Sequence, residues 1–218
     1  LEFRRVLFRS VKLPKTTIPN NNLVDMERMF DSCIGLTSVI FPQETQIFPS
    51  TISKMFNNCP KLSDLSLSGI DTTYVSDFSY LFNECHKLTT VNLKDFKTST
   101  VNNRMDYMFN NCNKLASLDL SKLGITLTTN LSNIFNGCQS LSYLNLNGFT
   151  TTDLADFSYF FNELTNLKTL IMTNFKGSTN VNRMDHMFNN CKSLISLSLP
   201  NLDTSLTTTM TYMFNGCN

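Results

Sequence analysis

A motif anchored on phenylalanine recurs eight times along the 218 residues of the chain. The anchors are Phe30, Phe56, Phe82, Phe109, Phe135, Phe161, Phe188 and Phe214, at spacings of 26, 26, 27, 26, 26, 27 and 26 residues. Because a unit this short cannot bury its own apolar side chains, it must share a core with its neighbours. The repeat therefore predicts a solenoid. The 27-residue spacing returns every third unit, which indicates a duplicated three-unit block of 79 residues.

Each unit contains two different apolar periods. Four positions follow the helical pattern i, i+3, i+4 and i+7, as in Met26, Met29, Phe30 and Cys33, and predict a short helix. A Leu-x-x-Leu-x-Leu segment follows, whose period of two predicts a short strand with one buried face. We therefore expect an α/β repeat, with short strands on one face of the solenoid and short helical turns on the other.

The residue five positions before the anchor supports a helix start in most units. Its side chain can accept a hydrogen bond from a free N–H group, as an N-cap does. These residues are Asp25, Thr51, Asp77, Asn130, Asp156 and Thr209. Arg104 and Arg183 are the exceptions, and there Asn103 or Asn182, one residue earlier, is the expected cap.

The motif Met-Phe-x-x-Cys-x-x-Leu-x-x-Leu-x-Leu resembles the BspA-like leucine-rich-repeat surface proteins and the related mycoplasma-type surface repeats. The resemblance covers Met26 to Asn218. It implies a leucine-rich-repeat solenoid and a secreted or surface-anchored binding and adhesion module. We expect one such domain over residues 11–218, with about seven to eight units and truncated at both ends.

The first ten residues do not follow the repeat. Their sequence, LEFRRVLFRS, is the translation of a common short-read sequencing adaptor. We therefore interpret residues 1–10 as an assembly artefact and not as a targeting segment. A native signal peptide is then not observable, so localisation at the cell surface is an expectation that comes from the family resemblance.

Composition argues against two classes of partner. The formal net charge is +1 and charged residues make up 16% of the chain, so no basic patch for nucleic acid is expected. No apolar run approaches the ~20 residues that a membrane-spanning helix needs.

The seven cysteines are all three residues after an anchor phenylalanine. They are Cys33, Cys59, Cys85, Cys112, Cys138, Cys191 and Cys217, and Leu164 takes the place of cysteine in the sixth unit. A position that accepts leucine is apolar, so we expect a structural ladder of buried thiols. Disulfides between neighbouring rungs are the alternative, since rungs ~4.8 Å apart allow them. Parallel side chains do not converge on one metal ion, so no metal is expected.

No combination of residues predicts catalysis. His86 and His186, the only histidines, are four units apart and cannot share a reaction. No phosphate-binding or zinc-protease motif is present, and no cofactor is expected. Asparagine follows the anchor phenylalanine in seven of the eight units, from Asn57 to Asn215, with Asp31 in the first, and could form a hydrogen-bonded column.

Binding is the expected function, and the exposed face of the strands is the expected site. The candidate ligand-binding residues, which flank the buried strand leucines, are Asp64, Asn92, Lys94, Asp119, Tyr143 and Asn145. Small polar side chains favour weak, multivalent contact to a protein or glycan of a host or neighbouring cell. Two alternatives remain: an intracellular protein-interaction scaffold, and the targeting repeats of a larger enzyme whose catalytic domain lies elsewhere.

Overall fold

A computed structural model describes residues 9–13, 23–41, 47–67, 69–93, 96–98, 103–121, 123, 128–147, 149, 156–173, 182–199 and 201–218. Within these ranges the regular structure consists of short strands and contains no helix. The strands are β1 (Ser10–Lys12), β2 (Val24–Asp25), β3 (Ser38–Ile40), β4 (Pro49–Thr51), β5 (Asp64–Ser66), β6 (Thr90–Asn92), β7 (Asn103–Arg104), β8 (Ser117–Asp119), β9 (Thr128–Asn130), β10 (Tyr143–Asn145), β11 (Thr169–Ile171), β12 (Asn182–Arg183) and β13 (Thr207–Thr209). All of the pairings between them are parallel.

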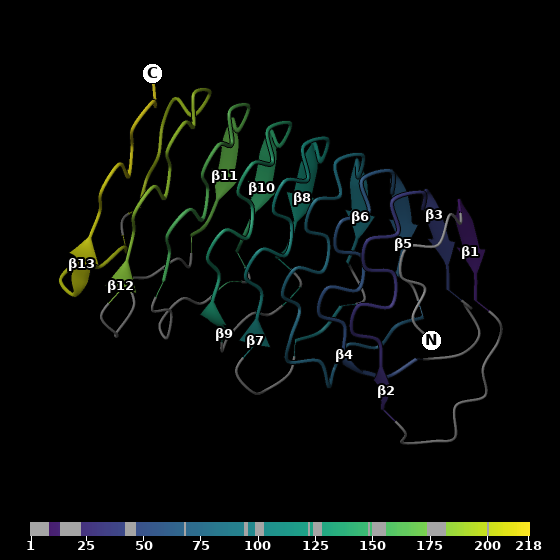
Figure 1. The fold of residues 1–218 in the computed structure, drawn as a ribbon. Coiled ribbons are helices and arrows are strands. Elements are labelled where there is room, and N and C mark those ends of the chain that lie inside the picture. Colours follow the sequence, from purple (N-terminus) through teal and green to yellow (C-terminus); the bar gives the residue numbers. More distant parts are fainter. Residues whose placement is uncertain are drawn as a thin grey trace.

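The strands predicted from the leucine pattern form one side of an elongated solenoid. Along this side, β1, β3, β5, β6, β8, β10 and β11 follow one another in chain order (Figure 1). The central residue of each strand points inward, and Val39, Leu65, Leu118 and Leu144 are buried. We call the outward surface of these strands the strand face.

The sheet of the strand face is interrupted where the repeat is one residue longer. It divides into a four-stranded sheet, β1-β3-β5-β6, and a three-stranded sheet, β11-β10-β8. The break between β6 and β8 coincides with the 27-residue spacing between Phe82 and Phe109. The second such spacing follows β11, and there the expected strand around Leu197 does not form. The extra residue thus offsets one rung from the next and ends the backbone pairing.

A second row of short strands runs along the opposite edge in Figure 1. It contains the pairs β2-β4, β7-β9 and β12-β13, with a register shift in each. Each shift leaves one residue of the second strand without a partner in register. In two of the pairs, the hydroxyl of this bulged residue donates a hydrogen bond to the previous rung. Ser50 donates to the carbonyl of Val24 at 3.3 Å, and Thr208 donates to that of Asn182 at 3.0 Å. The bulges recur every third rung and match the 79-residue period.

The prediction of a short helix before each anchor phenylalanine is wrong. The segment instead forms successive turns whose N–H groups alternate between two kinds of partner. The N–H of Arg28 donates to the carbonyl of Ser53 on the next rung at 3.0 Å, and the N–H of Phe30 donates to Met55 at 2.9 Å. Between them, the N–H of Asp31 donates within the rung to the carbonyl of Arg28 at 3.0 Å. Half of the hydrogen bonds therefore join rungs, which an α-helix does not allow.

Two left-handed residues in every rung produce these turns. One lies two residues before the anchor and the other two residues after it, and most are not glycine. The first set is Arg28, Lys54, Tyr80, Tyr107, Asn133, Tyr159, His186 and Tyr212, and the second is Ser32, Asn58, Glu84, Asn111, Gly137, Glu163, Asn190 and Gly216. A left-handed residue other than glycine costs about 1–2 kcal/mol. We infer that the hydrogen bonds to the next rung compensate for this strain.

The anchor phenylalanines form one continuous stack through the core. Ring centroids of consecutive anchors lie between 4.9 Å, for Phe161 and Phe188, and 6.3 Å, for Phe135 and Phe161. The seven anchors from Phe30 to Phe188 are completely buried. The first leucine of each strand motif is buried from Leu36 to Leu167, whereas Leu194, Leu197 and Leu199 are partly buried. The Phe column is therefore core over all seven rungs, and the column of first leucines is core until the rung of Phe188.

The predicted asparagine column is confirmed over all eight rungs. Each amide nitrogen donates to the side-chain oxygen of the preceding rung, beginning with Asn57 to Asp31 at 2.7 Å and ending with Asn215 to Asn189 at 2.9 Å. The intermediate bonds, through Asn83, Asn110, Asn136 and Asn162, are 2.5–2.8 Å long. We call this chain of side chains the asparagine ladder.

The last rung differs from the interior rungs in its exposure. Phe214 is 51% exposed and Cys217 is exposed, so the expected burial of both columns fails there. Phe214 stacks on Phe188 at 5.5 Å, and no described rung covers its other face. Of residues 1–10 only Arg9 and Ser10 are described, and Ser10 lies in β1.

Candidate functional site

The strand face presents two rows of side chains on either side of the buried central residues. Parallel pairing places equivalent strand positions side by side. Tyr143 is paired with Ser117 and Thr169, while Asn145 is paired with Asp119 and Ile171. The result is a mostly polar surface that continues from rung to rung within each of the two sheets.

The predicted ligand-binding residues are divided between these two rows. Asn92, Asp119 and Asn145 end β6, β8 and β10, and Asp119 and Asn145 are direct partners in register. Tyr143 begins β10 and belongs to the other row, and Asp64 is the first residue of β5. Lys94 lies outside the described residues. Asn92 and Asp119 are exposed, whereas Tyr143 and Asn145 are half-buried.

Two of these candidates also close the turn after their strand. Oδ1 of Asp119 accepts a hydrogen bond from the N–H of Ser121 at 2.9 Å. Oδ1 of Asn145 accepts one from the N–H of Asn147 at 3.1 Å. Both residues therefore have a local structural role, and a ligand would meet side chains that are already held in place.

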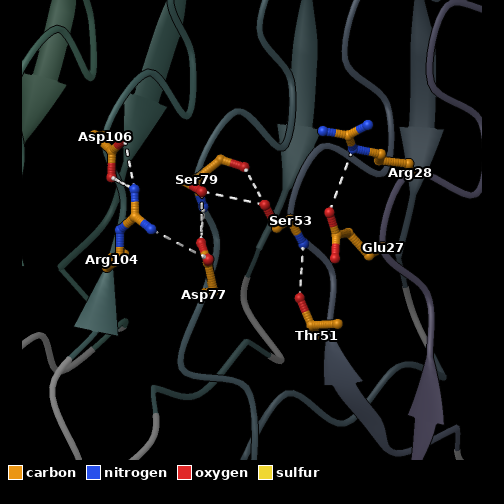
Figure 2. Close-up of polar contacts among 8 residues, drawn as sticks. All are labelled: Glu27, Arg28, Thr51, Ser53, Asp77, Ser79, Arg104 and Asp106. Carbon is orange, nitrogen blue, oxygen red and sulfur yellow. Dashed lines mark hydrogen bonds and ion pairs between the residues drawn. The ribbon is translucent and has the colours of Figure 1, made fainter.

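A band of polar side chains lies on the segment before each anchor, and Figure 2 shows four rungs of it. Five of the predicted cap residues, Asp25, Thr51, Asp77, Asn130 and Asp156, accept N–H bonds, but they close turns and do not start helices. In the last rung the N–H of Thr211 donates to Asp185 and not to the predicted cap Thr209. Asp77, for example, accepts from the N–H of Ser79 at 2.9 Å, and Asp156 accepts from that of Ser158 at 2.8 Å. The hydroxyls of Ser53 and Ser79 are 3.2 Å apart and join neighbouring rungs.

Arginine and aspartate replace this turn pattern in the two rungs that follow a 27-residue spacing. Arg104 lies 3.3 Å from the carboxylate of Asp106 and 3.8 Å from that of Asp77. In the equivalent rung, Arg183 lies 3.0 Å from Asp185. Burial opposes ionisation of Asp185, but hydrogen bonds from Thr209 and Arg183 outweigh it and lower the pKa of this carboxyl. The pattern fixes two arginines in ion pairs within the rungs.

The cysteines form a ladder of hydrogen-bonded thiols. From Cys59 onward, each thiol donates to the carbonyl of the anchor phenylalanine on the preceding rung, at 3.0–3.2 Å. The residues are Cys59, Cys85, Cys112, Cys138, Cys191 and Cys217, and all six are thiols and not disulfides. Burial raises the pKa of Cys85 and of Cys191 to about 12. The buried part of the column is therefore structural, and the reactive thiolate form of Cys85 and Cys191 is scarce at neutral pH.

A surface that the sequence analysis missed lies two residues before each anchor. This ring row consists of Arg28, Lys54, Tyr80, Tyr107, Asn133, Tyr159, His186 and Tyr212. Tyr80 and Tyr107 stack at 4.7 Å, and Nζ of Lys54 is 5.3 Å from the centroid of the Tyr80 ring. Burial, Tyr107 and Asp106 raise the pKa of Tyr80. Four of the six tyrosines of the chain share this position, which is the signal that identifies the row in the sequence.

The two histidines make separate local contacts. Nδ1 of His86 is 3.0 Å from the carbonyl of Asn111, and its Nε2 is 3.1 Å from Glu84. His186 stacks between the rings of Tyr159 and Tyr212. Within the described ranges, no three His, Cys, Asp or Glu side chains are grouped as metal ligands. The same ranges contain no helix with the length and hydropathy to cross a membrane.

Solved structures with this fold are leucine-rich-repeat proteins. One from Bacteroides ovatus aligns with a TM-score of 0.61 and 19% identity over 93% of this chain and 50% of its own. TpLRR of T. pallidum aligns with a TM-score of 0.56 and 18% identity over 87% of this chain and 79% of its own. The chain thus spans half the length of the Bacteroides protein. No curated protein sequence matches it.

The repeat itself is characteristic of one sequence family. The profile of the family described as mycoplasma protein of unknown function, DUF285, matches residues 24–143, 50–175 and 129–218. These overlapping matches cover every rung from β2 to the last residue. The chain therefore belongs to the DUF285 family, a relative of the BspA-like repeats, and has a parallel solenoid fold similar to that of leucine-rich-repeat proteins.

Proposed function

We propose that this protein is a non-enzymatic binding module at the cell surface, and that it contacts a protein or glycan through the strand face. The observation that carries the proposal is the in-register repetition of small polar side chains on consecutive strands, as in Asp119 and Asn145. A row of equivalent sites on a rigid array can bind a repetitive or extended partner with avidity, although each contact is weak.

The chemistry of the titratable groups supports binding over catalysis. Burial raises the pKa of the Cys85 and Cys191 thiols. The arginines of the polar band are held in ion pairs with Asp106 and Asp185. His86 and His186 each contact neighbours on adjacent rungs. These groups stabilise the array, and we assign the ligand to the polar strand face.

The test compares two variants with the parent protein on arrays of extracellular proteins and glycans. The first combines Asp119→Ala, Tyr143→Ala and Asn145→Ala on the strand face. The matched control combines Lys114→Ala and Gln139→Ala, which are exposed in the turn before β8 and β10. We expect the first variant to lose at least tenfold in affinity, about 1.4 kcal/mol, and the control to bind as the parent does.

Circular dichroism of both variants establishes that they are folded. If the folded strand-face variant keeps full affinity for every ligand of the parent, the site is elsewhere. If the parent binds nothing on the arrays, the adhesion proposal fails.

A second candidate function is an intracellular interaction scaffold, and the thiol ladder favours it. Oxidising compartments usually pair their cysteines, whereas all seven of these cysteines are thiols, six of them buried. The full open reading frame distinguishes the candidates: a signal peptide supports the surface, and the absence of one supports the scaffold. An attached catalytic domain would support the third alternative, the targeting repeats of a larger enzyme.

A further inference from the structure

The ring row is interrupted at a single rung in its aromatic part. Tyr80 and Tyr107 stack on the N-terminal side with an interplanar angle of 7°. Tyr159 and His186 stack on the C-terminal side, also with an angle of 7°. Asn133 occupies the rung between them. One face of Tyr107 and one face of Tyr159 are therefore directed toward the rung of Asn133, and no described aromatic ring lies between them.

The width of this gap corresponds to one flat ring. Tyr107 and Tyr159 are separated by two rungs, or roughly 10 Å at the spacing of parallel strands. The phenylalanine stack gives an internal measure, since Phe135 lies 6.0 Å from Phe109 and 6.3 Å from Phe161 on the same three rungs. A ring placed over Asn133 would therefore stack on both tyrosines at ordinary distances.

We propose that the gap over Asn133 binds one aromatic side chain of a partner polypeptide. The row itself demonstrates the chemistry, because the imidazole of His186 occupies the equivalent space between Tyr159 and Tyr212, at 4.6 and 5.0 Å. Tyr107 and Tyr159 are half-buried, which holds both walls in place before binding. This site lies on the segments before the anchors and does not depend on the strand face.

Two other occupants match the gap less well. A pyranose ring carries substituents around a puckered frame and stacks best on one open aromatic face, whereas this gap has two facing walls. A cation is bound within the row, where Lys54 lies over Tyr80 at 5.3 Å, but it contacts one ring at the end of a stack. Enclosure between two rings would remove more of its hydration.

The test uses N-acetyl-tryptophanamide, because the chain contains no tryptophan and the fluorescence of the probe is then unique in the sample. We expect saturable binding with a dissociation constant on the order of 1 mM. In protein with carbon-13-labelled tyrosine, the ring signals of Tyr107 and Tyr159 should shift, and that of Tyr143 on the strand face should not.

Asn133→Tyr is the decisive variant, because its own ring fills the gap. Tyrosine adopts the same left-handed backbone at Tyr80, Tyr107, Tyr159 and Tyr212, so the variant should fold. We expect it to lose binding at least tenfold. The control Asn133→Gly keeps the left-handed backbone and leaves the gap open, and it should bind as the parent does. If Asn133→Tyr does not fold, Tyr159→Leu removes one wall and should weaken binding severalfold.

Four results would overturn the proposal: no binding of the probe, equal binding by parent and Asn133→Tyr, shifts spread over all six tyrosines, or stronger shifts with N-acetyl-argininamide or an oligosaccharide. Because the strand-face variant leaves this gap intact, loss of one site and loss of the other are separate results.

Discussion

Gly137 shows how closely neighbouring rungs approach at the second left-handed position. It has φ of +72°, and a Cβ atom there would lie 2.2 Å from Oδ1 of Asn111 on the preceding rung. Gly216 repeats the arrangement 79 residues later, with Asn190 as the neighbour at 2.3 Å. The absence of a side chain therefore makes room for the amide of the adjacent rung.

We predict that Gly137→Ala lowers the free energy of unfolding by about 1–3 kcal/mol, because it adds both a clash and left-handed strain. Urea denaturation followed by circular dichroism measures the change. In an Asn111→Gly background the clash is removed, so the same substitution should cost less. An equal cost in both backgrounds would show that Asn111 does not cause the effect.

The cysteines differ in reactivity according to their position on the array. Burial raises the pKa of Cys85 and Cys191, so their reactive thiolate form is scarce at neutral pH. Cys217 on the last rung is exposed. We predict that iodoacetamide labels Cys217 in the native protein, and that the buried thiols react only after unfolding. Peptide mass spectrometry measures both, and rapid native labelling of Cys85 would contradict the prediction.

At the scale of the element, the asparagine ladder is a cross-rung structure made only of side chains. Asn136 donates to Asn110 at 2.8 Å and accepts from Asn162 at 2.5 Å. We predict that Asn136→Ala costs about 1–3 kcal/mol, because it leaves a buried donor and a buried acceptor without partners. Chemical denaturation measures this loss.

Asn215 provides the matched control, since it donates to Asn189 and is itself exposed. Asn215→Ala should therefore cost clearly less than Asn136→Ala. Equal effects would mean that the ladder contributes no more inside the array than at its end.

The sequence predicts the columns well and the backbone between them poorly. The period identified the Phe, Leu and Asn columns, because each requires the same residue type on every rung. The apolar spacing i, i+3, i+4, i+7 from Met26 to Cys33 is typical of a helix. The successive turns of this segment, however, direct the same positions toward the core. The left-handed conformation at two positions of each rung could not be predicted from the residue types, since residues such as Arg28, Lys54 and Glu84 seldom adopt it.

The ring row was missed for a related reason. Its position holds Arg, Lys, Tyr, Asn and His in different rungs, so no single residue type fills every rung. A helical interpretation also places this position on the solvent side, where rings on successive units would not stack. Only the cross-rung backbone bonds, such as that from Tyr107 to Ser132 at 3.1 Å, bring these side chains to stacking distance. For the strand face, by contrast, the period of two was sufficient.

At the scale of the molecule, the 79-residue block is a structural unit. Asp77 pairs with Arg104, and Asp156 pairs with Arg183, through equivalent isolated bridges. Deleting residues 104–182 joins Asn103 to Arg183 and recreates the local sequence Asn-Arg-Met-Asp. It also restores a 27-residue spacing between Phe82 and Phe188.

We predict that this shortened chain folds with the same circular dichroism per residue as the parent. The slope of its unfolding free energy against urea concentration should fall in proportion to the number of rungs removed, because each rung contacts only its neighbours. Size-exclusion chromatography and urea denaturation test both expectations. An unfolded product would show that the block does not form an independent part of the array.

The asparagine ladder also gives the solenoid a direction. Every amide nitrogen points toward the preceding rung, so the side-chain dipoles add along the axis with their positive ends toward Asp31. A negative charge at the positive end of aligned dipoles is stabilising, as at the start of a helix. A carboxylate lacks the N–H groups with which an asparagine amide donates, so the relay of amide bonds ends at Asp31. Asp31, the single departure from asparagine in this column, is therefore the residue at which the asparagine ladder stops.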